Sequence, residues 1–343
     1  MRTAIIVGVA GTKLSRDEAQ FLKDAEPAGF ILFGRNLESH EQIRALIGDV
    51  RAAVGADDLL VLIDQEGGRV QRLRPPLGRA LPPAAAYGQL YASDRDGAVT
   101  AAFEAARLLA EDLTALGINT DCAPVLDLPV PGSHDIIGDR AYGRSVEQIV
   151  ALARAVADGF IAGGVVPVIK HIPGHGRATA DSHLALPVVA DSRFELLATD
   201  FAPFRALRDL PAAMTAHVVF SDIDPNAPAS ISPVVIGEIV RGVIGFDGLL
   251  MSDDLSMKAL SGPMLQRSEA VIAAGSDVVL HCNGDFREMI GAAAGAGVLH
   301  GRGQERFEAA VNITKATQPF DSAAAEAQLA KVLAFAAGGT ESV

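Results

Sequence analysis

Residues 59–72 read Leu-Leu-Val-Leu-Ile-Asp-Gln-Glu-Gly-Gly-Arg-Val-Gln-Arg, in which an unbroken apolar run is followed at once by charged and polar residues. An apolar residue at every position of a short run is typical of a parallel strand that is buried on both faces. Other short apolar or β-branched runs recur along the chain. We expect strands over residues 4–10, 30–33, 59–64, 120–126, 165–171, 213–220, 248–253 and 277–282.

Helical patterns fill the intervals between these strands. Over residues 103–116 the apolar residues recur at spacings of three and four, and Gly117 follows at a position that often ends a helix. Ser145 and Gln148 resemble a capping box at the start of another helix. Strands that alternate with helices in this number fit a single (β/α)8 TIM-type barrel better than an open sheet. No GxGxxG motif follows the first strand to indicate a dinucleotide-binding domain.

The composition limits the partners of the protein. The chain has 343 residues, of which 49% are hydrophobic, enough for a large core and unlike an intrinsically disordered chain. It has 29 basic and 42 acidic residues, a formal net charge of −13, and no long basic run. We therefore expect no nucleic acid and no membrane among its partners.

Further features bear on compartment and domain organisation. The apolar run 4–10 is short for a signal peptide, so we interpret it as the first core strand of a cytoplasmic protein. No apolar run reaches the roughly 18 residues that a membrane span needs. Cys122 and Cys282 lie in apolar runs outside any zinc-ligand pattern, and we expect buried thiols of a reducing compartment. We predict one domain over residues 1–343, a monomer, with a helical extension over about 303–343 packed on the barrel.

Ionisable side chains end or follow several of the predicted strands. They include Asp64, Glu66, Lys170, His171, His217, Asp253, Asp254 and His281. The carboxyl ends of barrel strands meet on one face, and the active sites of such barrels lie there. We therefore expect these side chains to converge on one site.

Two chemistries of this site involve the segment after the fifth strand. His171 and His175 have the spacing of a helical metal motif, but Pro173 and Gly174 lie between them, so we expect no helix and no metal there. Lys170 could form a Schiff base, or it could bind a hydroxyl or carboxylate of a substrate. The sequence alone gives no sign that the pKa of this lysine is lowered.

A third chemistry is glycoside hydrolysis, which needs a carboxylate nucleophile and a separate proton donor. Asp253 or Asp254 could supply the nucleophile, and alternation along the strand predicts that one of the two faces the pocket. His183 is a candidate donor, because Asp181 two residues before it could orient the imidazole and stabilise its charged form.

Four segments match a known family in order and spacing. They are Asp64–Arg72 (DQEGGRVQR), Lys170–Gly176 (KHIPGHG), Asp181–His183 (DSH) and Ser252–Met257 (SDDLSM). Together they resemble the bacterial β-N-acetylhexosaminidases of glycoside hydrolase family 3. The resemblance implies a cytoplasmic peptidoglycan-recycling enzyme without cofactor or metal. Such enzymes release terminal β-linked N-acetylglucosamine from small saccharides, the muropeptide fragments that carry 1,6-anhydro-N-acetylmuramic acid.

The resemblance also implies roles for individual residues. Asp253 corresponds to the nucleophile that forms a covalent glycosyl-enzyme, His183 to the acid/base, and Asp181 to its dyad partner. The sugar-binding positions of the family correspond to Asp64, Arg72, Arg140, Lys170 and His171. On the residues alone, the two arginines could equally form surface ion pairs.

Two other functions stay open on the same scaffold. A histidine donor, unlike a carboxylate, would not repel phosphate, so a glycoside phosphorylase is one alternative. A sugar-binding protein without catalysis is the other, although a binder has no need for Asp253. Larger relatives carry a second domain that often supplies an acidic donor, and we expect none here.

Several polar residues near the predicted site have structural interpretations. We expect Ser252 and Asp254 to cap the following helix. Glu66 could brace Arg69 or a loop amide, and His175 is expected to shape its loop. His217 matches a motif of the resembling family near the site without a defined role, and no role follows from the sequence for Asp127 and His281.

Overall fold

Eight parallel strands form a closed barrel in the computed structural model, which describes residues 2–178 and 186–338. Each barrel strand pairs with the strands before and after it in the chain, and the last pairs with the first through Ile5 and Val279. The barrel strands are β1 (Thr3–Gly8), β2 (Pro27–Leu32), β3 (Leu60–Ile63), β6 (Thr120–Asp121), β7 (Val166–Ile172), β9 (Ala212–Thr215), β11 (Leu249–Asp254) and β12 (Val278–His281). The predicted (β/α)8 barrel is therefore confirmed.

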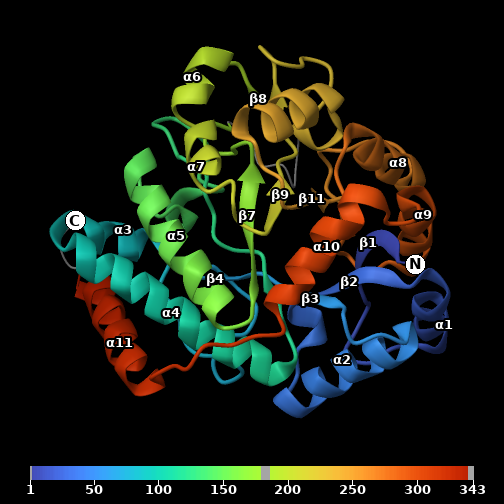
Figure 1. Ribbon diagram of the computed structural model, residues 1–343, viewed down its shortest axis with the longest axis horizontal. Coiled ribbons are helices and arrows are strands. Elements are labelled where there is room, and N and C mark those ends of the chain that lie inside the picture. The colour runs from blue at the N-terminus through green and yellow to red at the C-terminus, as the bar shows by residue number, and fades with distance from the viewer. Residues whose placement is uncertain (1, 179–185, 339–343) are drawn as a thin grey trace.

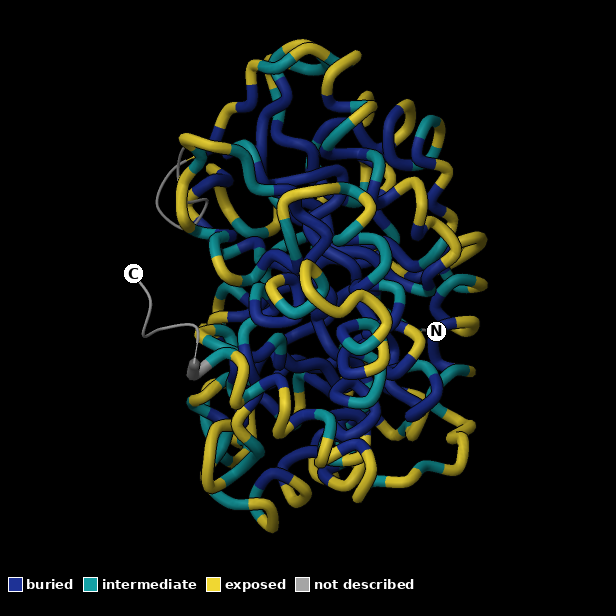
Figure 2. Tube along the Cα trace, turned by 90° about the vertical axis from the view of Figure 1, so that its left-hand side faces the viewer, coloured by how far each residue is buried: buried dark blue, intermediate teal, exposed yellow. Residues whose placement is uncertain are grey.

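Helices surround the strands, as Figure 1 shows. Those in the intervals between barrel strands, and after the last one, are α1 (Arg16–Ala25), η1 (Gly34–Asn36), α2 (His40–Val54), α3 (Ala84–Ser93), α4 (Arg95–Leu116), η2 (Gly138–Arg140), α5 (Val146–Ala162), α6 (Arg193–Ala198), α7 (Phe201–Ala206), η3 (Ala229–Ile231), η4 (Val235–Ile244), α8 (Met264–Ala274) and α9 (Phe286–Ala296). Figure 2 shows buried segments through the middle of the molecule and exposed ones at its periphery.

The predicted helix ends are largely confirmed. Gly117 ends α4 in the left-handed region, at φ 88°, and its N–H donates to the carbonyls of Leu113 and Thr114. Ser145 begins α5 by accepting a hydrogen bond from the Gln148 N–H. The Gln148 side chain donates instead to the Gly88 carbonyl on α3, so only half of the predicted capping box forms.

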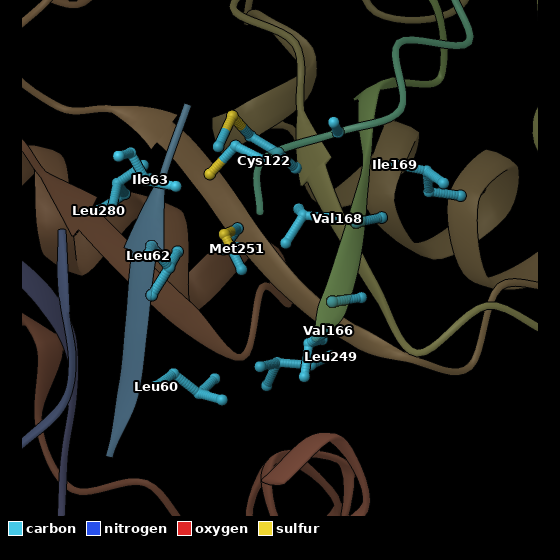
Figure 3. Packing of buried hydrophobic residues seen from close by; sticks show 14 of the residues in the cluster. Leu60, Leu62, Ile63, Cys122, Val166, Val168, Ile169, Leu249, Met251 and Leu280 are labelled. Atoms are coloured by element: carbon cyan, nitrogen blue, oxygen red, sulfur yellow. The ribbon is translucent and has the colours of Figure 1, made fainter. Parts of the chain in front are cut away.

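The interior of the barrel is filled with apolar side chains. Leu62, Val168 and Met251 come from three different strands, are fully buried, and point into the space that the strands enclose (Figure 3). Ile169, the next residue along β7, points to the opposite side, toward the surrounding helices. Because side chains fill the interior, a ligand site has to lie at one end of the barrel.

Two predicted strands are shorter than expected by more than two residues. The fourth keeps only Thr120–Asp121, because Pro124 lacks an N–H for a regular ladder, although Val125 still bridges to Lys170. The sixth ends at Thr215. The rest of its apolar run forms β10 (Val219–Phe220), which pairs outside the barrel with β8 (Val188–Val189).

The segment after β3 forms a small hairpin that the sequence did not predict. Its strands are β4 (Gln65–Gly67) and β5 (Val70–Gln71), joined through Gly67 and Gly68, which have φ values of 102° and 54°. A Cβ on Gly67 would lie 2.4 Å from the Pro82 carbonyl oxygen, so no other residue fits without a shift. The hairpin turns the chain back so that Arg72 returns to Asp64.

The alanine-rich C-terminal segment is helical, as predicted. It forms α10 (Gly301–Ile313) and α11 (Ser322–Gly338), and α11 packs against α3 and α4. The guanidinium of Arg107 on α4 donates to the Gln318 carbonyl and lies over the Phe320 ring. Both cysteines are free and buried, as expected. Within the described residues, no helix is long and apolar enough to cross a membrane.

Candidate active site

A cavity of about 280 Å³ opens at the carboxyl ends of the barrel strands. Its lining includes every sugar-binding residue predicted from the sequence and also Asp253, that is, Asp64, Arg72, Arg140, Lys170, His171 and Asp253. These residues come from segments up to 189 positions apart, 253 − 64, which the barrel topology brings to one end. The predicted dyad, Asp181 and His183, lies outside the described residues.

Asp64 accepts hydrogen bonds from two basic side chains at the base of the cavity. Its Oδ2 lies 2.9 Å from Nη2 of Arg72, and its Oδ1 lies 3.1 Å from Nζ of Lys170. Burial raises the pKa of Asp64, but the positive charges of Lys170 and Arg72 outweigh that effect and hold it below its usual value. Asp64 is therefore ionised at neutral pH and can only accept hydrogen bonds.

Glu66 pairs with Arg140 rather than with Arg69, so the expectation that it braces Arg69 is wrong. Two hydrogen bonds of 2.8 Å join its carboxylate to Nε and Nη2 of Arg140, and Nζ of Lys170 lies 2.6 Å from Oε1. The Glu66 and Arg140 side chains are only 6% and 10% exposed, so this is not a surface ion pair. Arg69 binds Asp139 at 2.7 Å instead.

The environment of Lys170 disfavours Schiff-base chemistry, which needs a neutral amine. Burial lowers the pKa of this lysine. The carboxylates of Glu66 and Asp64 raise this pKa by more than burial lowers it, so the net shift is upward. The side chain therefore carries an ammonium group that donates hydrogen bonds. Pairing with β9 shifts register after Lys170, and both Lys170 and His171 line the cavity.

Asp127 is a residue that the sequence analysis left without a role. Its side chain is completely buried, and its Oδ2 lies 2.6 Å from Nδ1 of His171. Its Oδ1 accepts backbone hydrogen bonds from His171 at 3.2 Å and His175 at 2.7 Å. Burial raises the pKa of Asp127, but His171 lowers it more, so the carboxylate is ionised. The sequence held one sign that Asp127 has a role, namely that it is a charged residue between apolar neighbours at a strand end.

His175 lines the cavity with its ring at 5.6 Å from that of His171. Burial, and then the nearby His171, lower its pKa to about 4, so the ring is neutral at physiological pH. Over residues 2–178 and 186–338, no group of three or more His, Cys, Asp and Glu side chains could hold a metal ion.

Asp253 and Asp254 end β11, and both line the cavity, although strict alternation predicted only one of them. The register of β11 shifts between Met251 and Asp254, which breaks the alternation. The Asp253 Oδ1 accepts a hydrogen bond of 2.8 Å from the Asp254 N–H. Asp254 in turn accepts from the backbone N–H groups of Ser256 and Cys282, both at 3.0 Å.

The expectation that Ser252 and Asp254 cap the following helix is wrong. A turn follows β11, and α8 begins only at Met264 with Pro263 at its N-cap position. Ser252 is buried within β11, and its hydroxyl accepts a hydrogen bond of 3.1 Å from the Leu280 N–H of β12. Both side chains therefore connect β11 to β12 rather than to a helix.

His217 supports β11 from outside the cavity. Its Nε2 lies 3.0 Å from the Asp254 carbonyl oxygen, and its Nδ1 lies 2.7 Å from the Ser230 hydroxyl. A carbonyl oxygen can only accept, so Nε2 carries the proton and Nδ1 accepts from Ser230. Burial lowers the pKa of His217, so the neutral ring joins these two segments.

Comparison with known proteins agrees with this geometry. The glycosyl hydrolase family 3 N terminal domain matches residues 4–313. The chain belongs to glycosyl hydrolase family 3. A relative named Beta-hexosaminidase, from Alkalilimnicola ehrlichii, is 42% identical over 81% of this chain and 80% of its own length.

Solved structures of family 3 proteins share the fold. A family 3 β-N-acetylglucosaminidase from Paenibacillus sp. has a TM-score of 0.85 and 30% identity, over 97% of this chain and 67% of its own. NagZ from Neisseria gonorrhoeae, solved in complex with N-trifluoroacetyl-D-glucosamine, has a TM-score of 0.79 and 33% identity, over 98% of both chains. This family 3 chain is therefore a glycoside hydrolase.

Among the described residues that line the cavity of this family 3 glycoside hydrolase, the formal charges of the acidic side chains and of the arginine and lysine side chains are balanced. Four of these residues are basic and four are carboxylates: Arg69, Arg72, Arg140 and Lys170 with Asp64, Glu66, Asp253 and Asp254. The formal net charge of the whole chain is −13. The excess of negative charge therefore lies away from the cavity lining, and buried carboxylates within it have cationic or backbone donors close by.

Proposed function

We propose that the protein is a retaining exo-β-N-acetylglucosaminidase. It releases non-reducing terminal β-linked N-acetylglucosamine from GlcNAc-1,6-anhydroMurNAc and its peptide forms during peptidoglycan recycling in the cytoplasm. The observation that supports this proposal most directly is that Asp253 lines the same cavity as the ionised Asp64 and its arginine and lysine partners. Support also comes from the relatives named Beta-hexosaminidase and from a similar structure in complex with a glucosamine derivative.

In the proposed first step, Asp253 attacks the anomeric carbon of the sugar. A bond forms between a carboxylate oxygen and C1 while the bond from C1 to the glycosidic oxygen breaks, and His183 gives its proton to that oxygen. Asp181 orients His183 and stabilises its imidazolium form. In the second step a water molecule attacks C1, His183 takes the proton from the water, and Asp253 is released as a carboxylate.

The proposed role of Asp253 is supported by its surroundings. The Asp254 N–H donates to Asp253 Oδ1, and Asp254 is itself fixed by two backbone donors, so the tip of β11 is held rigidly. A fixed carboxylate loses little entropy when it reaches the reacting geometry.

The remaining cavity residues are proposed to bind the sugar. Asp64 accepts from hydroxyl groups, and Arg72, Arg140 and Lys170 donate to the oxygens of the ring substituents. Salt bridges within the cavity hold these four side chains in place before the substrate arrives. In this proposal residues 1–343 act as one barrel domain, with the helices after about residue 303 packed on its outside.

The test is hydrolysis of p-nitrophenyl β-N-acetylglucosaminide compared with the β-glucoside, in buffers with and without phosphate. We expect a strong preference for the N-acetyl sugar and release of free N-acetylglucosamine. Formation of the sugar 1-phosphate would identify a phosphorylase instead. Absence of activity on both glycosides would leave sugar binding as the function.

The same assay tests His183, which lies outside the described residues. The variant His183→Ala should slow natural disaccharides, whose leaving groups need a proton, far more than p-nitrophenyl glycosides, whose leaving group does not. Equal losses on both substrates would argue for a binding role of His183.

A further inference from the structure

Asp127 and His171 form a buried carboxylate–imidazole pair next to the cavity. The carboxylate is completely buried, whereas the His171 side chain remains 9% exposed and lines the cavity. Oδ2 of Asp127 lies 2.6 Å from Nδ1 of His171, which is a short hydrogen-bond distance, and the contact is buried. An ionised carboxylate only accepts hydrogen bonds, so Nδ1 of His171 must carry a proton.

This contact fixes what the other ring nitrogen can do. The hydrogen bond at one nitrogen of an imidazole determines the role of the other. With Nδ1 protonated and directed at Asp127, Nε2 is the ring atom left to meet a ligand. The same carboxylate accepts from the N–H groups of His171 and His175, so it holds both the ring and the backbone that carries it.

We propose that Asp127 is a positioning residue that keeps the proton of His171 on Nδ1 and presents Nε2 to a hydroxyl of the bound sugar. This inference rests on the proposed function, because it takes His171 to be a sugar-binding residue. Asp127 itself does not line the cavity, so it acts on the substrate only through His171.

The variant Asp127→Asn isolates this role. An asparagine can keep its Oδ1 on the backbone N–H groups of His171 and His175, while its amide places an N–H donor against Nδ1 of His171. Nδ1 must then accept, and the proton moves to Nε2. The shape of the site is retained, but the hydrogen-bonding role of the atom that faces the cavity is reversed.

The first measurement is spectroscopic and does not depend on activity. Long-range ¹⁵N–¹H spectra of protein labelled with ¹⁵N-histidine report which ring nitrogen carries the proton. The signals of His171 are assigned as those missing from the variant His171→Gln. At a pH at which the His171 ring carries a single proton, we expect that proton on Nδ1 in the wild type and on Nε2 in Asp127→Asn. The same protonated nitrogen in both proteins would overturn the inference.

The second measurement is kcat/KM for p-nitrophenyl β-N-acetylglucosaminide. Loss of a hydrogen bond between charged or strongly polarised groups predicts a decrease of at least about tenfold for Asp127→Asn. In the His171→Gln background the same change should cost less than about twofold, because its effect passes through His171. A loss of equal size in both backgrounds would overturn the proposal that Asp127 acts through His171.

Asp277→Asn is the matched control. Asp277 is also a buried carboxylate that accepts a backbone N–H, from Leu250, but it lies at the opposite end of the barrel. We expect it to lower stability without lowering kcat/KM of the folded enzyme. An inactive wild type would overturn the proposed function and this role together, whereas an active wild type with an unchanged Asp127→Asn variant would overturn the role of Asp127 alone.

Discussion

The two ends of the barrel carry similar ion-pair networks that serve different purposes. At the carboxyl end, Asp64 pairs with Arg72 and Lys170 around a cavity. At the amino end, Asp277 pairs with Arg241 at 2.8 Å and Arg306 at 2.9 Å, and it accepts the Leu250 N–H.

The difference lies in what the charges face. The amino-end network ties α10 and η4 to the starts of β11 and β12, and the Arg241 guanidinium also donates to the carbonyls of Phe246 and Gly248. The arginine N–H groups of this network donate to acceptors of the protein itself. The carboxyl-end network faces an open cavity of about 280 Å³, where its side chains can also meet a ligand. In an α/β barrel the first arrangement supports stability and the second supports function.

The largest effect should come from Asp253→Ala at the carboxyl end. Loss of the proposed nucleophile predicts a decrease in kcat of at least about 10⁴-fold. The thermal unfolding midpoint should stay close to that of the wild type, because Asp253 is only partly buried. Near-normal turnover would remove Asp253 as the nucleophile.

At the amino end, Arg241→Met should mainly affect stability. Asp277 keeps Arg306 as a partner, but it and two backbone carbonyls lose the mostly buried Arg241 donor, and together these lost hydrogen bonds cost about 3 kcal/mol of unfolding free energy. The quantity to measure is urea-induced unfolding, with kcat/KM of the folded protein as the control. A decrease in kcat/KM of more than about twofold would show that the amino-end network also supports activity, contrary to the comparison.

Arg72→Met is the matched change at the carboxyl end. Asp64 keeps Lys170 as a partner, and the Arg72 side chain is 33% exposed, so stability should change by less than about 1 kcal/mol. Loss of the proposed charged donor to the sugar predicts a decrease in kcat/KM of about 100-fold. A variant that loses stability but keeps its kcat/KM would place Arg72 with the structural network.

Asp121 tests the comparison further, because it lies beside the carboxyl-end network but forms no ion pair with any described residue. Its Oδ1 accepts the Gln65 N–H, and its buried Oδ2 has no hydrogen-bond partner among the described residues. Burial raises the pKa of Asp121 to about 8, against about 3.9 in an unfolded chain. Between these values the folded protein keeps a proton that the unfolded chain has lost, so the contribution of Asp121 to stability falls as the pH rises.

Asp121→Asn removes this dependence. The unfolding free energy of the variant minus that of the wild type should increase by about 1.4 kcal/mol for each pH unit that the pH rises between about pH 5 and 7. It should level off above the folded pKa of about 8. Denaturant unfolding at several pH values measures it, and a difference that does not depend on pH would show that Asp121 is ionised in the folded protein.

The sequence predicted the fold well because the barrel depends on local pattern. The fully apolar runs and the helical spacing located all eight strands, and Gly117 and Ser145 marked helix ends correctly. The errors occurred where an apolar run continued beyond the hydrogen-bonded ladder, as after Thr215. Apolar character reports burial, and residues buried beneath the loops are as apolar as those in the strands.

The site was predicted in part. The motifs identified Asp64, Arg72, Arg140, Lys170, His171 and Asp253, which lie together around one cavity. The sequence analysis gave Asp127 no role, and the alternatives that it left open for Glu66, Arg69 or a loop amide, did not include Arg140, because those contacts join segments 44 and 74 residues apart. No local pattern encodes such a pairing.

The sequence by itself determined the alternation of strands and helices, the family, and which residue types stand at the strand ends. Only the tertiary structure decided which charges meet. Closing the barrel brings Asp64 and Lys170, 106 residues apart, to 3.1 Å. Their contact keeps the carboxylate ionised and the amine protonated despite burial, since each charge compensates the desolvation of the other. Protonation states depend on neighbours in space, and those neighbours exist only once the barrel has closed.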